Sequence, residues 1–443
     1  MSSLIRASKF KHVYCDSPRI DATFQNLRLS TVTGEQNYIK ANSNYFAIGL
    51  QGGGGPVAII PHDKPGRARV DMPVLSGHAG PVLDFDFNPF DDQMIATASE
   101  DTTIKVWQFP EGGLTSTINT PALELTGHGR KVTLLRFHPT ASNVILSSSA
   151  DQTVRLWDIE KGIDVHANRD VTELIQDIVW DYHGNQYAIS SKDKNIRLVD
   201  GRTGTTSSTI ENAHEGTKSF KLSYLGQVNK IVSVGFTKSS MRQFKIWDPR
   251  NTSTEFLRVE IDQAAGVIMP FFDQDTGLLY LSGKGDGNVR CYEISNEGDQ
   301  AFAVTDFRSN VSAKGMAMVP KRGLNIMANE TARLLKLTTN AVEPLSFFIP
   351  RKSEGFQEDI FPDTFSGEPS HTAEEWLNGS DQAPKLTSLN PSNGGSAKSS
   401  RPNTLTKSRS LKSVAELSTE LEQARARIKF LEDKLRDNNI SID

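Results

Sequence analysis

The sequence has few cysteines, no long apolar run and no marked excess of charge of either sign. Only two cysteines, Cys15 and Cys291, occur in 443 residues, which is too few for a disulfide framework and suits a reducing compartment. No run of about 18 apolar residues predicts a membrane span, and the charged segment 1–11 lacks the apolar core of a signal peptide. With 49 basic and 53 acidic residues, the net charge of −4 argues against a nucleic-acid-binding protein. These absences predict a soluble, cytoplasmic protein.

The charge is distributed unevenly along the chain. Residues 385–443 carry 11 basic and 7 acidic side chains, whereas residues 1–384 carry 38 and 46. Residues 385–413 contain 11 Ser or Thr and six Lys or Arg but no Asp or Glu, so we expect a disordered basic linker there. Phosphorylation would reduce the linker's positive charge at Ser408, Ser410 and Ser413. A linker without regulation is the alternative.

A β-type pattern repeats before this linker. Short alternating runs, such as 103–107 and 153–157, are bounded by Asp, Gly, Asn and Pro, which is typical of strands. Gly-His pairs at 77–78 and 127–128 are followed by a Ser-x-Asp turn and a Trp. The predicted turn positions lie 42 to 50 residues apart, at 101, 151, 193, 241, 286 and 330. This period and these marks predict WD repeats, which form four-stranded propeller blades.

The number of repeats predicts the fold class. Six turns are visible, and the region before Gly77 has room for one more unit. We therefore predict an all-β, seven-bladed β-propeller over residues 1–349, with six or eight blades as alternatives. We expect the segment 10–14 to complete the last sheet, because open sheet edges promote aggregation.

The polar residues of the repeat resemble a catalytic Ser/His/Asp set. They recur at the repeat period, however, and a nucleophile would be unique. We interpret them as a structural hydrogen-bond network within each blade: His78, Ser99, Asp101, Trp107, His128, Ser149, Asp151 and Trp157. Glycine-rich stretches at 52–55, 215–219 and 283–287 lack the spacing or the following helix of a nucleotide-binding loop. The sequence thus predicts no enzyme, no cofactor and no metal site.

Several stretches are more specific than a general propeller pattern. They are 7–14, 110–114, 283–290, 350–353, 359–362 and 372–376. Together they resemble the coronin family, in its short form with a single propeller. The resemblance implies a protein of the cytoplasm, the actin cytoskeleton and the cell cortex that binds actin filaments and modulates filament turnover. It also implies the branched-actin nucleating (Arp) complex as a partner. A WD-repeat scaffold that does not bind actin is the alternative.

The segment 344–384 is rich in Phe, Pro and Asp and has little periodicity, and the C-terminal extension is assigned to residues 350–384 within it. We expect it to be an extension that packs on the propeller, and a spacer is the alternative. Thr372 and Glu375 have the spacing of a capping box, which predicts one short helix. The predicted anchors of the extension are aromatic: Phe347, Phe348, Phe356, Phe361 and Trp376.

Arg28 is the residue that the family resemblance assigns to filament binding. Its planar guanidinium suits this task because it can donate two parallel hydrogen bonds to one carboxylate of an acidic filament. An ordinary solvated arginine on an edge strand is the alternative.

The residues from 414 to 443 have the pattern of a parallel coiled coil. Apolar residues recur at a and d positions: Val414, Leu417, Leu421, Ala424, Ile428, Leu431 and Leu435. Arg427 and Glu432, with the Ile and Leu between them, resemble a trimerisation signature in which the Arg stem covers the core. We predict a homotrimer, with a dimer as the alternative. Several propellers on one coil would strengthen filament binding and permit crosslinking.

Overall fold

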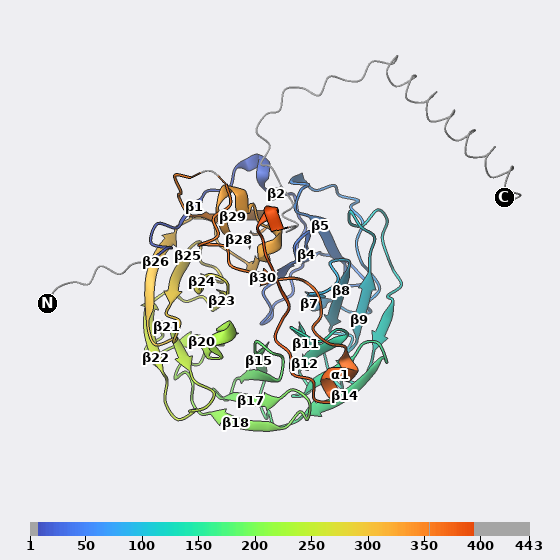
Figure 1. The fold of residues 1–443 in the computed structure, drawn as a ribbon. Coiled ribbons are helices and arrows are strands. Elements are labelled where there is room, and N and C mark those ends of the chain that lie inside the picture. The colour runs from blue at the N-terminus through green and yellow to red at the C-terminus, as the bar shows by residue number, and fades with distance from the viewer. Residues whose placement is uncertain (1–7, 354, 394–443) are drawn as a thin grey trace, which may run out of the picture. The chain divides into compact units, whose positions relative to one another are not determined.

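Seven sheets stand around a central axis within residues 8–353 and 355–393, which the computed structural model describes (Figure 1). We number these sheets as blades 1 to 7 in chain order. Blades 2 to 6 each contain four antiparallel strands that follow one another along the chain. The predicted all-β, seven-bladed propeller is therefore confirmed.

The strands of blades 2 to 6 have these bounds. Blade 2 consists of β7 (Val82–Phe87), β8 (Met94–Ser99), β9 (Ile104–Gln108) and β10 (Leu123–Leu125). Blade 3 consists of β11 (Val132–Phe137), β12 (Val144–Ser149), β13 (Val154–Asp158) and β14 (Ile163–Asn168). Blade 4 consists of β15 (Ile175–Trp180), β16 (Gln186–Ser191), β17 (Ile196–Asp200) and β18 (Thr206–Ile210). Blade 5 consists of β19 (Lys221–Tyr224), β20 (Ile231–Phe236), β21 (Arg242–Trp247) and β22 (Leu257–Asp262). Blade 6 consists of β23 (Ile268–Asp273), β24 (Leu278–Gly283), β25 (Val289–Ile294) and β26 (Ala301–Phe307).

One turn recurs before the third strand of blades 2, 3 and 4. The carboxylate of its Asp accepts a hydrogen bond from the backbone N–H two residues later, at 2.9 to 3.1 Å, in Asp101, Asp151 and Asp193. The residue between donor and acceptor is left-handed, with φ of 73°, 66° and 69° at Thr102, Gln152 and Lys194. Asp favours this turn because its short side chain bonds locally to the backbone. The repeating Asp of the sequence thus has a structural cause.

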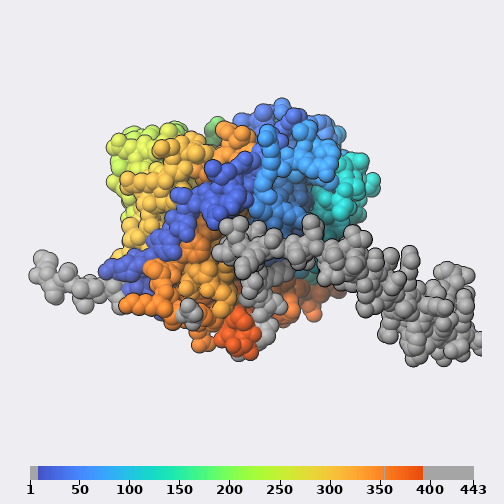
Figure 2. Space-filling view, turned by 90° about the horizontal axis from the view of Figure 1, so that it is seen from above, coloured from blue at the N-terminus to red at the C-terminus, as the bar shows by residue number. Residues whose placement is uncertain are grey.

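The two ends of the propeller share one sheet. Blade 1 has β3 (Ile39–Ala41), β4 (Tyr45–Gly49) and β5 (Val57–Pro61), and blade 7 has β27 (Gly315–Met318), β28 (Glu330–Leu337) and β29 (Val342–Phe348). The N-terminal strand β1 (Tyr14–Asp16) pairs antiparallel with β29, and β2 (Phe24–Gln25) joins β29 to β6 (Gly66–Arg67). In Figure 2 the blue N-terminal segment accordingly lies against the orange strands near the end of the ring.

The strand that closes the ring lies slightly later than predicted. The expected segment was 10–14, whereas the paired residues are Tyr14–Asp16. Phe10 and Val13 are buried instead, at 8% and 4% exposure, in the apolar core that includes blade 7. The N-terminal segment therefore closes the ring with both a strand and apolar contacts.

The last predicted repeat unit is out of register. Glu330 was aligned with Asp101, which lies between the second and third strands of its blade. In the structure Glu330 begins β28, the second strand of blade 7. The connection before it holds two short 3-10 turns, η3 (Lys321–Gly323) and η4 (Ile326–Ala328), which lengthen this unit. Glu330 therefore has the sequence spacing of the repeat but does not occupy the repeat's turn.

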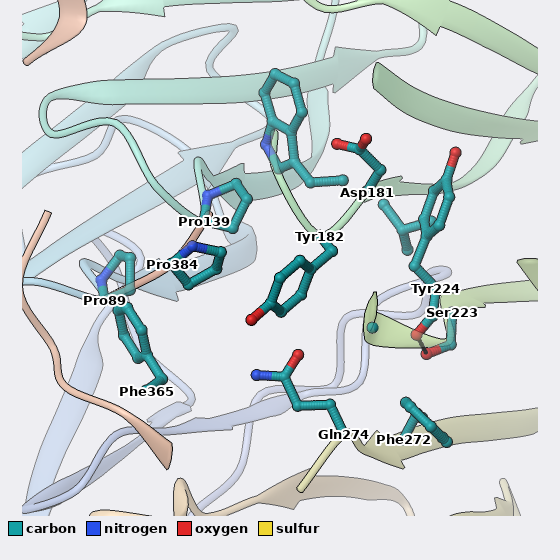
Figure 3. Close-up of a pocket in the computed structure, with 13 residues that line it drawn as sticks. Pro89, Pro139, Asp181, Tyr182, Ser223, Tyr224, Phe272, Gln274, Phe365 and Pro384 are labelled. Carbon is teal, nitrogen blue, oxygen red and sulfur yellow. Dashed lines mark hydrogen bonds between the residues drawn. The ribbon is translucent and has the colours of Figure 1, made fainter. Parts of the chain in front are cut away.

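The extension after β29 crosses one face of the ring and returns (Figure 1). Its elements are β30 (Thr364–Phe365), the helix α1 (Ala373–Leu377), β31 (Leu386–Thr387) and η5 (Pro391–Asn393), and β30 pairs with β31. The predicted capping box is present, because the Thr372 hydroxyl accepts from the Glu375 N–H and the Glu375 carboxylate accepts from the Thr372 N–H. Phe365 and Pro384 form part of a pocket with residues of the blades (Figure 3).

The anchors of the extension differ in part from the prediction. Phe361 and Trp376 are buried, at 2% and 0% exposure, and Phe356 packs on the same core as Phe361. Phe347 and Phe348 belong to β29 and so to blade 7 itself. The linker predicted over 385–413 begins too early, since Leu386–Thr387 form a strand and Leu389 is 5% exposed.

No helix within the described part of the chain is long and apolar enough to cross a membrane.

Candidate functional site

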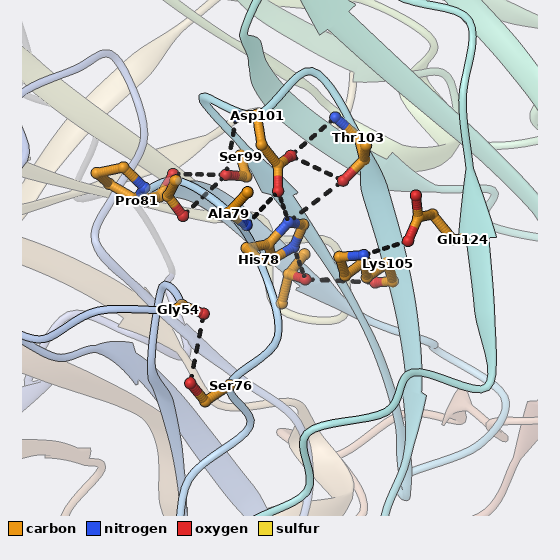
Figure 4. Close-up of polar contacts among 12 residues, drawn as sticks. Gly54, Ser76, His78, Ala79, Pro81, Ser99, Asp101, Thr103, Lys105 and Glu124 are labelled. Atoms are coloured by element: carbon orange, nitrogen blue, oxygen red, sulfur yellow. Dashed lines mark hydrogen bonds and ion pairs between the residues drawn. The ribbon is translucent and has the colours of Figure 1, made fainter.

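A chain of hydrogen bonds runs through the interior of blade 2 (Figure 4). Asp101 bonds Nδ1 of His78 at 2.8 Å, and Nε2 of His78 meets the Thr97 hydroxyl at 2.7 Å. The indole N–H of Trp107 donates to the same hydroxyl at 2.8 Å. The chain therefore links the loop before β7 to β8, to the turn after β8 and to β9.

Blade 3 repeats this arrangement with one substitution. Asp151 bonds His128 at 2.9 Å, and His128 and Trp157 both meet the hydroxyl of Ser147 at 2.7 Å. In blade 5 the partners are His214, Ser233 and Trp247, with Gln243 in the place of the turn Asp. The hydroxyl at the centre is thus common to three blades, while the acidic end varies.

The predicted Ser99 and Ser149 bond to the turn at one end of this network. Their hydroxyls accept the N–H groups of Asp101 and Asp151, at 3.2 and 3.1 Å, and donate to the carbonyls of Pro81 and Arg130, both at 2.9 Å. They do not join the histidine to the tryptophan. Thr97 and Ser147, two residues earlier, hold the central position. The strand register contains the signal, since Thr97 is opposite Lys105 and therefore diagonal to Trp107.

The electrostatics and burial of this network fit a structural role. Burial alone would raise the pKa of the Asp151 carboxyl. Hydrogen bonds from His128 and Thr153 outweigh burial and lower this pKa, so the carboxyl stays ionised. Burial lowers the pKa of His78 despite its Asp101 partner. Thr97 and Ser147 are 1% and 0% exposed, so their hydroxyls have no access to a substrate. This arrangement ties strands together and gives no exposed nucleophile.

Charged residues that the sequence analysis did not single out join neighbouring blades. The Asp84 carboxylate on β7 accepts the N–H of Leu135 on β11 at 3.0 Å, and Asp177 on β15 accepts the N–H of Leu222 on β19 at 3.1 Å. Arg136 lies between the two acids and pairs with both, at 3.3 and 3.0 Å. Inner strands are thereby connected across blades 2 to 5, through residues too far apart in sequence to suggest pairing.

Arg242 makes a similar connection between blades 5 and 6. Its guanidinium is fully buried and bonds Asp262 at 2.6 Å and Asp286 at 2.9 Å. Asp286 is the turn residue of blade 6. The turn Asp of blades 2 and 3 bonds a histidine of its own blade, whereas the Asp286 carboxylate bonds Arg242 of the neighbouring blade. The stretch 283–287 is the hairpin between β24 and β25, as its sequence predicted.

Arg28 lies in the extended segment between β2 and blade 1. Its neighbours Leu27 and Leu29 are buried, at 3% and 9% exposure, and Arg28 itself is exposed. Its carbonyl accepts a hydrogen bond from the Gln51 N–H at 2.9 Å, and Leu29 forms a bridge with Leu50. Within residues 8–353 and 355–393, no hydrogen bond or ion pair engages the Arg28 guanidinium. The backbone is thus fixed while the charged group faces solvent.

The predicted coiled coil lies outside the described residues. This applies to every predicted oligomerisation residue and to the three linker serines: Val414, Leu417, Leu421, Ala424, Arg427, Ile428, Leu431, Glu432, Leu435, Ser408, Ser410 and Ser413. Among the residues that are described, no group of three His, Cys, Asp or Glu side chains is placed to hold a metal ion.

Comparison with known families and proteins agrees with this architecture. A model described as Domain of unknown function (DUF1899) matches residues 3–67, the WD domain, G-beta repeat, matches 70–108 and 119–158, and a type of WD40 repeat matches 342–384. A chain of the mitotic checkpoint complex has a similar fold, with a TM-score of 0.57 at 14% identity over 76% of this chain and 97% of that one.

Two relatives are much more similar. The crystal structure of the WD40 domain of Toxoplasma gondii coronin has a TM-score of 0.82 at 32% identity and covers 86% of this chain and 98% of that chain. Coronin-A of Dictyostelium discoideum is 44% identical over 390 residues, which are 88% of this chain and 87% of that protein. The chain therefore belongs to the coronin family.

Proposed function

We propose that the protein binds actin filaments and that Arg28 lies at the contact. The observation that carries this proposal is that Arg28, which the family resemblance assigns to filament binding, is exposed. Its guanidinium has no partner in the described part of the chain. Among the described residues, no ion pair of the Arg28 guanidinium has to break before this group meets a carboxylate. The buried neighbours Leu27 and Leu29 fix the backbone, so little conformational entropy is lost on binding.

The proposal extends to assembly. The heptad pattern from Val414 onward supports a parallel homotrimer, with a dimer as the alternative. Tethered propellers raise the effective concentration of each filament site, so an oligomer would crosslink filaments and bind them more tightly than one propeller. In this role the protein would act in the cytoplasm and at the cell cortex and would modulate branched-actin nucleation by the Arp complex and filament turnover.

Co-sedimentation with actin filaments tests the contact. We expect Arg28→Asp to weaken filament binding by at least about tenfold, because a cation that can bond a carboxylate is replaced by an anion that repels it. The midpoint of thermal unfolding should not change, since the Arg28 side chain has no hydrogen bond or ion pair among the described residues that would be lost.

Arg169→Asp is the matched control. Arg169 lies in the connection between β14 and β15, is exposed, and likewise has no side-chain partner among the described residues. The charge change is identical, so this variant should pellet like the unmodified protein. Equal pelleting of both variants would remove Arg28 from the contact, and a wild-type protein that stays in the supernatant would favour the WD-repeat scaffold instead.

A further inference from the structure

We propose that the face of the ring crossed by the extension binds a proline-containing, basic linear segment of a partner protein. The surface consists of two adjoining hollows, which we call the aromatic pocket and the acidic groove. Tyr182, Phe272 and Gln274 line both, so the two hollows form one continuous depression. Arg28 lines neither hollow, and this site is therefore separate from the proposed actin contact.

The aromatic pocket has a volume of about 390 Å³ and is walled by rings. In Figure 3, Pro89, Pro139, Pro384 and Phe365 form one side, Tyr224 and Phe272 lie on the other, and Tyr182 lies between them. Aromatic-lined grooves of this kind bind polyproline II segments, whose rigid backbone loses little entropy on docking. The side walls come from blades 2 to 6 and from the extension, so the intact ring is needed to form the pocket.

One polar group of the pocket is available to a peptide backbone. The Tyr182 hydroxyl points into the pocket in Figure 3 and accepts from Gln227 at 3.2 Å, which leaves its own proton to donate. A polyproline II segment has no internal hydrogen bonds, so its carbonyls are free acceptors.

The acidic groove selects the charge of the partner. It has a volume of about 900 Å³, and among the described residues of its lining Lys9 is the one basic residue, beside Asp275, Glu293, Glu358, Asp359 and Asp363. Asp359 is paired with Arg351 at 2.6 Å. Glu358 and Asp363 are exposed and have no ion pair within the described part of the chain. Lys or Arg next to the prolines would meet these two free carboxylates.

Asp275 adds to the same preference. Burial, together with the nearby carboxylate of Asp273, raises the pKa of Asp275 to about 6. The hydroxyl of Thr364, from the extension, donates to it at 2.6 Å. A cationic side chain in the groove would favour the ionised form of this carboxyl. The chain's own basic stretch 394–413 contains a single proline, Pro402, so a partner with several prolines fits the aromatic pocket better.

Fluorescence anisotropy with the full-length protein tests the proposal. The probe is a fluorescein-labelled peptide in which two Arg flank a Pro-Leu-Pro-Pro-Leu-Pro core. We expect saturable binding, and we expect the double variant Glu358→Gln, Asp363→Asn to weaken it about fivefold through the loss of two exposed ion pairs. Phe272→Leu should also weaken binding, because the flat ring that the prolines contact is removed.

Two controls test whether the acidic groove itself, and not negative charge elsewhere on the surface, binds the probe. The double variant Glu173→Gln, Glu211→Gln removes two exposed acids outside the groove and should bind the probe like the unmodified protein. A probe with Glu in place of Arg should not bind. The groove variant should still pellet with actin filaments as the wild type does, so this proposal and the proposed actin contact can fail independently.

Three results would overturn the proposal. They are a wild-type protein that does not bind the probe, equal binding by the groove variant, and at least tenfold tighter binding by a chain that ends at Asn393. The last result would show that the chain's own basic stretch, and not a partner, is the natural occupant.

Discussion

At the scale of single residues, the hydroxyl at the centre of the blade network is the most sensitive position. Thr97→Val keeps the shape of the side chain but leaves the buried ring nitrogens of His78 and Trp107 without their shared partner. We expect a loss of about 2 kcal/mol in the free energy of unfolding, measured by chemical denaturation. Thr97→Ser is the matched control, because blade 3 uses Ser147 at the same position.

The two Thr97 variants distinguish a bonded hydroxyl from simple packing. If the network matters as described, Thr97→Ser should be the more stable variant although it loses a methyl group. A Val variant at least as stable as the Ser variant would show that the hydroxyl contributes nothing.

His138 provides a second residue-scale prediction. Its Nδ1 accepts the N–H groups of Thr140 and Ala141, at 3.1 and 2.8 Å, and its Nε2 bonds the Gly184 carbonyl. Burial lowers the pKa of His138 to about 3, well below that of an unfolded histidine. The folded protein therefore disfavours the protonated ring. The stabilisation is complete above about pH 6.5 and is lost as the pH falls towards the folded pKa.

The expected loss from His138 between pH 7 and pH 5 is about 2 kcal/mol. Thermal or chemical unfolding at both pH values measures it. His138→Asn retains a local acceptor without titration, so this variant should be less stable at pH 7 but less dependent on pH. An unchanged pH dependence in the variant would contradict the assignment.

At the scale of elements, the extension depends on the docking of α1. Trp376 is fully buried against His138 and Trp180, with ring centroids 4.5 and 6.0 Å away, and its carbonyl accepts from Arg202 at 2.7 Å. Trp376→Ala removes the ring contacts but keeps the carbonyl that Arg202 bonds, and losses of about 3–5 kcal/mol are typical of such truncations. We expect amide hydrogen exchange to accelerate over residues 370–380 while the blades stay protected.

Leu377→Ala is the control for this helix, because Leu377 is next in sequence but only partly buried. It should leave exchange over 370–380 nearly unchanged. Equal protection in the Trp376 variant and the wild type would show that the indole does not hold the extension on the ring.

The sequence predicts the elements well where local chemistry sets them. The Asp turns, the alternating strands and the Thr372 capping box all depend on residues close together in the chain. Thr97 was missed because its role depends on register, and Asp84 and Arg242 were missed because their partners lie on neighbouring blades. The linker was predicted to begin too early, since the pairing of Leu386 with Phe365 depends on a long-range contact.

At the scale of the whole molecule, the main prediction is the assembly state, a homotrimer with a dimer as the alternative. The chain has a mass of 48.8 kDa, so a trimer should give about three times that mass in sedimentation equilibrium and a dimer about twice. A chain that ends at Asn393 keeps β31 and the buried Leu389 and should be a monomer. A monomeric full-length protein would contradict the predicted coil.

The most direct test of the central proposal is co-sedimentation of the full-length protein with actin filaments at low ionic strength, beside the chain that ends at Asn393. We predict that the full-length protein pellets with the filaments and that the shortened chain pellets more weakly but measurably, since it keeps Arg28 and the whole ring. If the full-length protein remains in the supernatant even when filaments are in large excess over it, the proposal that this ring binds actin is wrong.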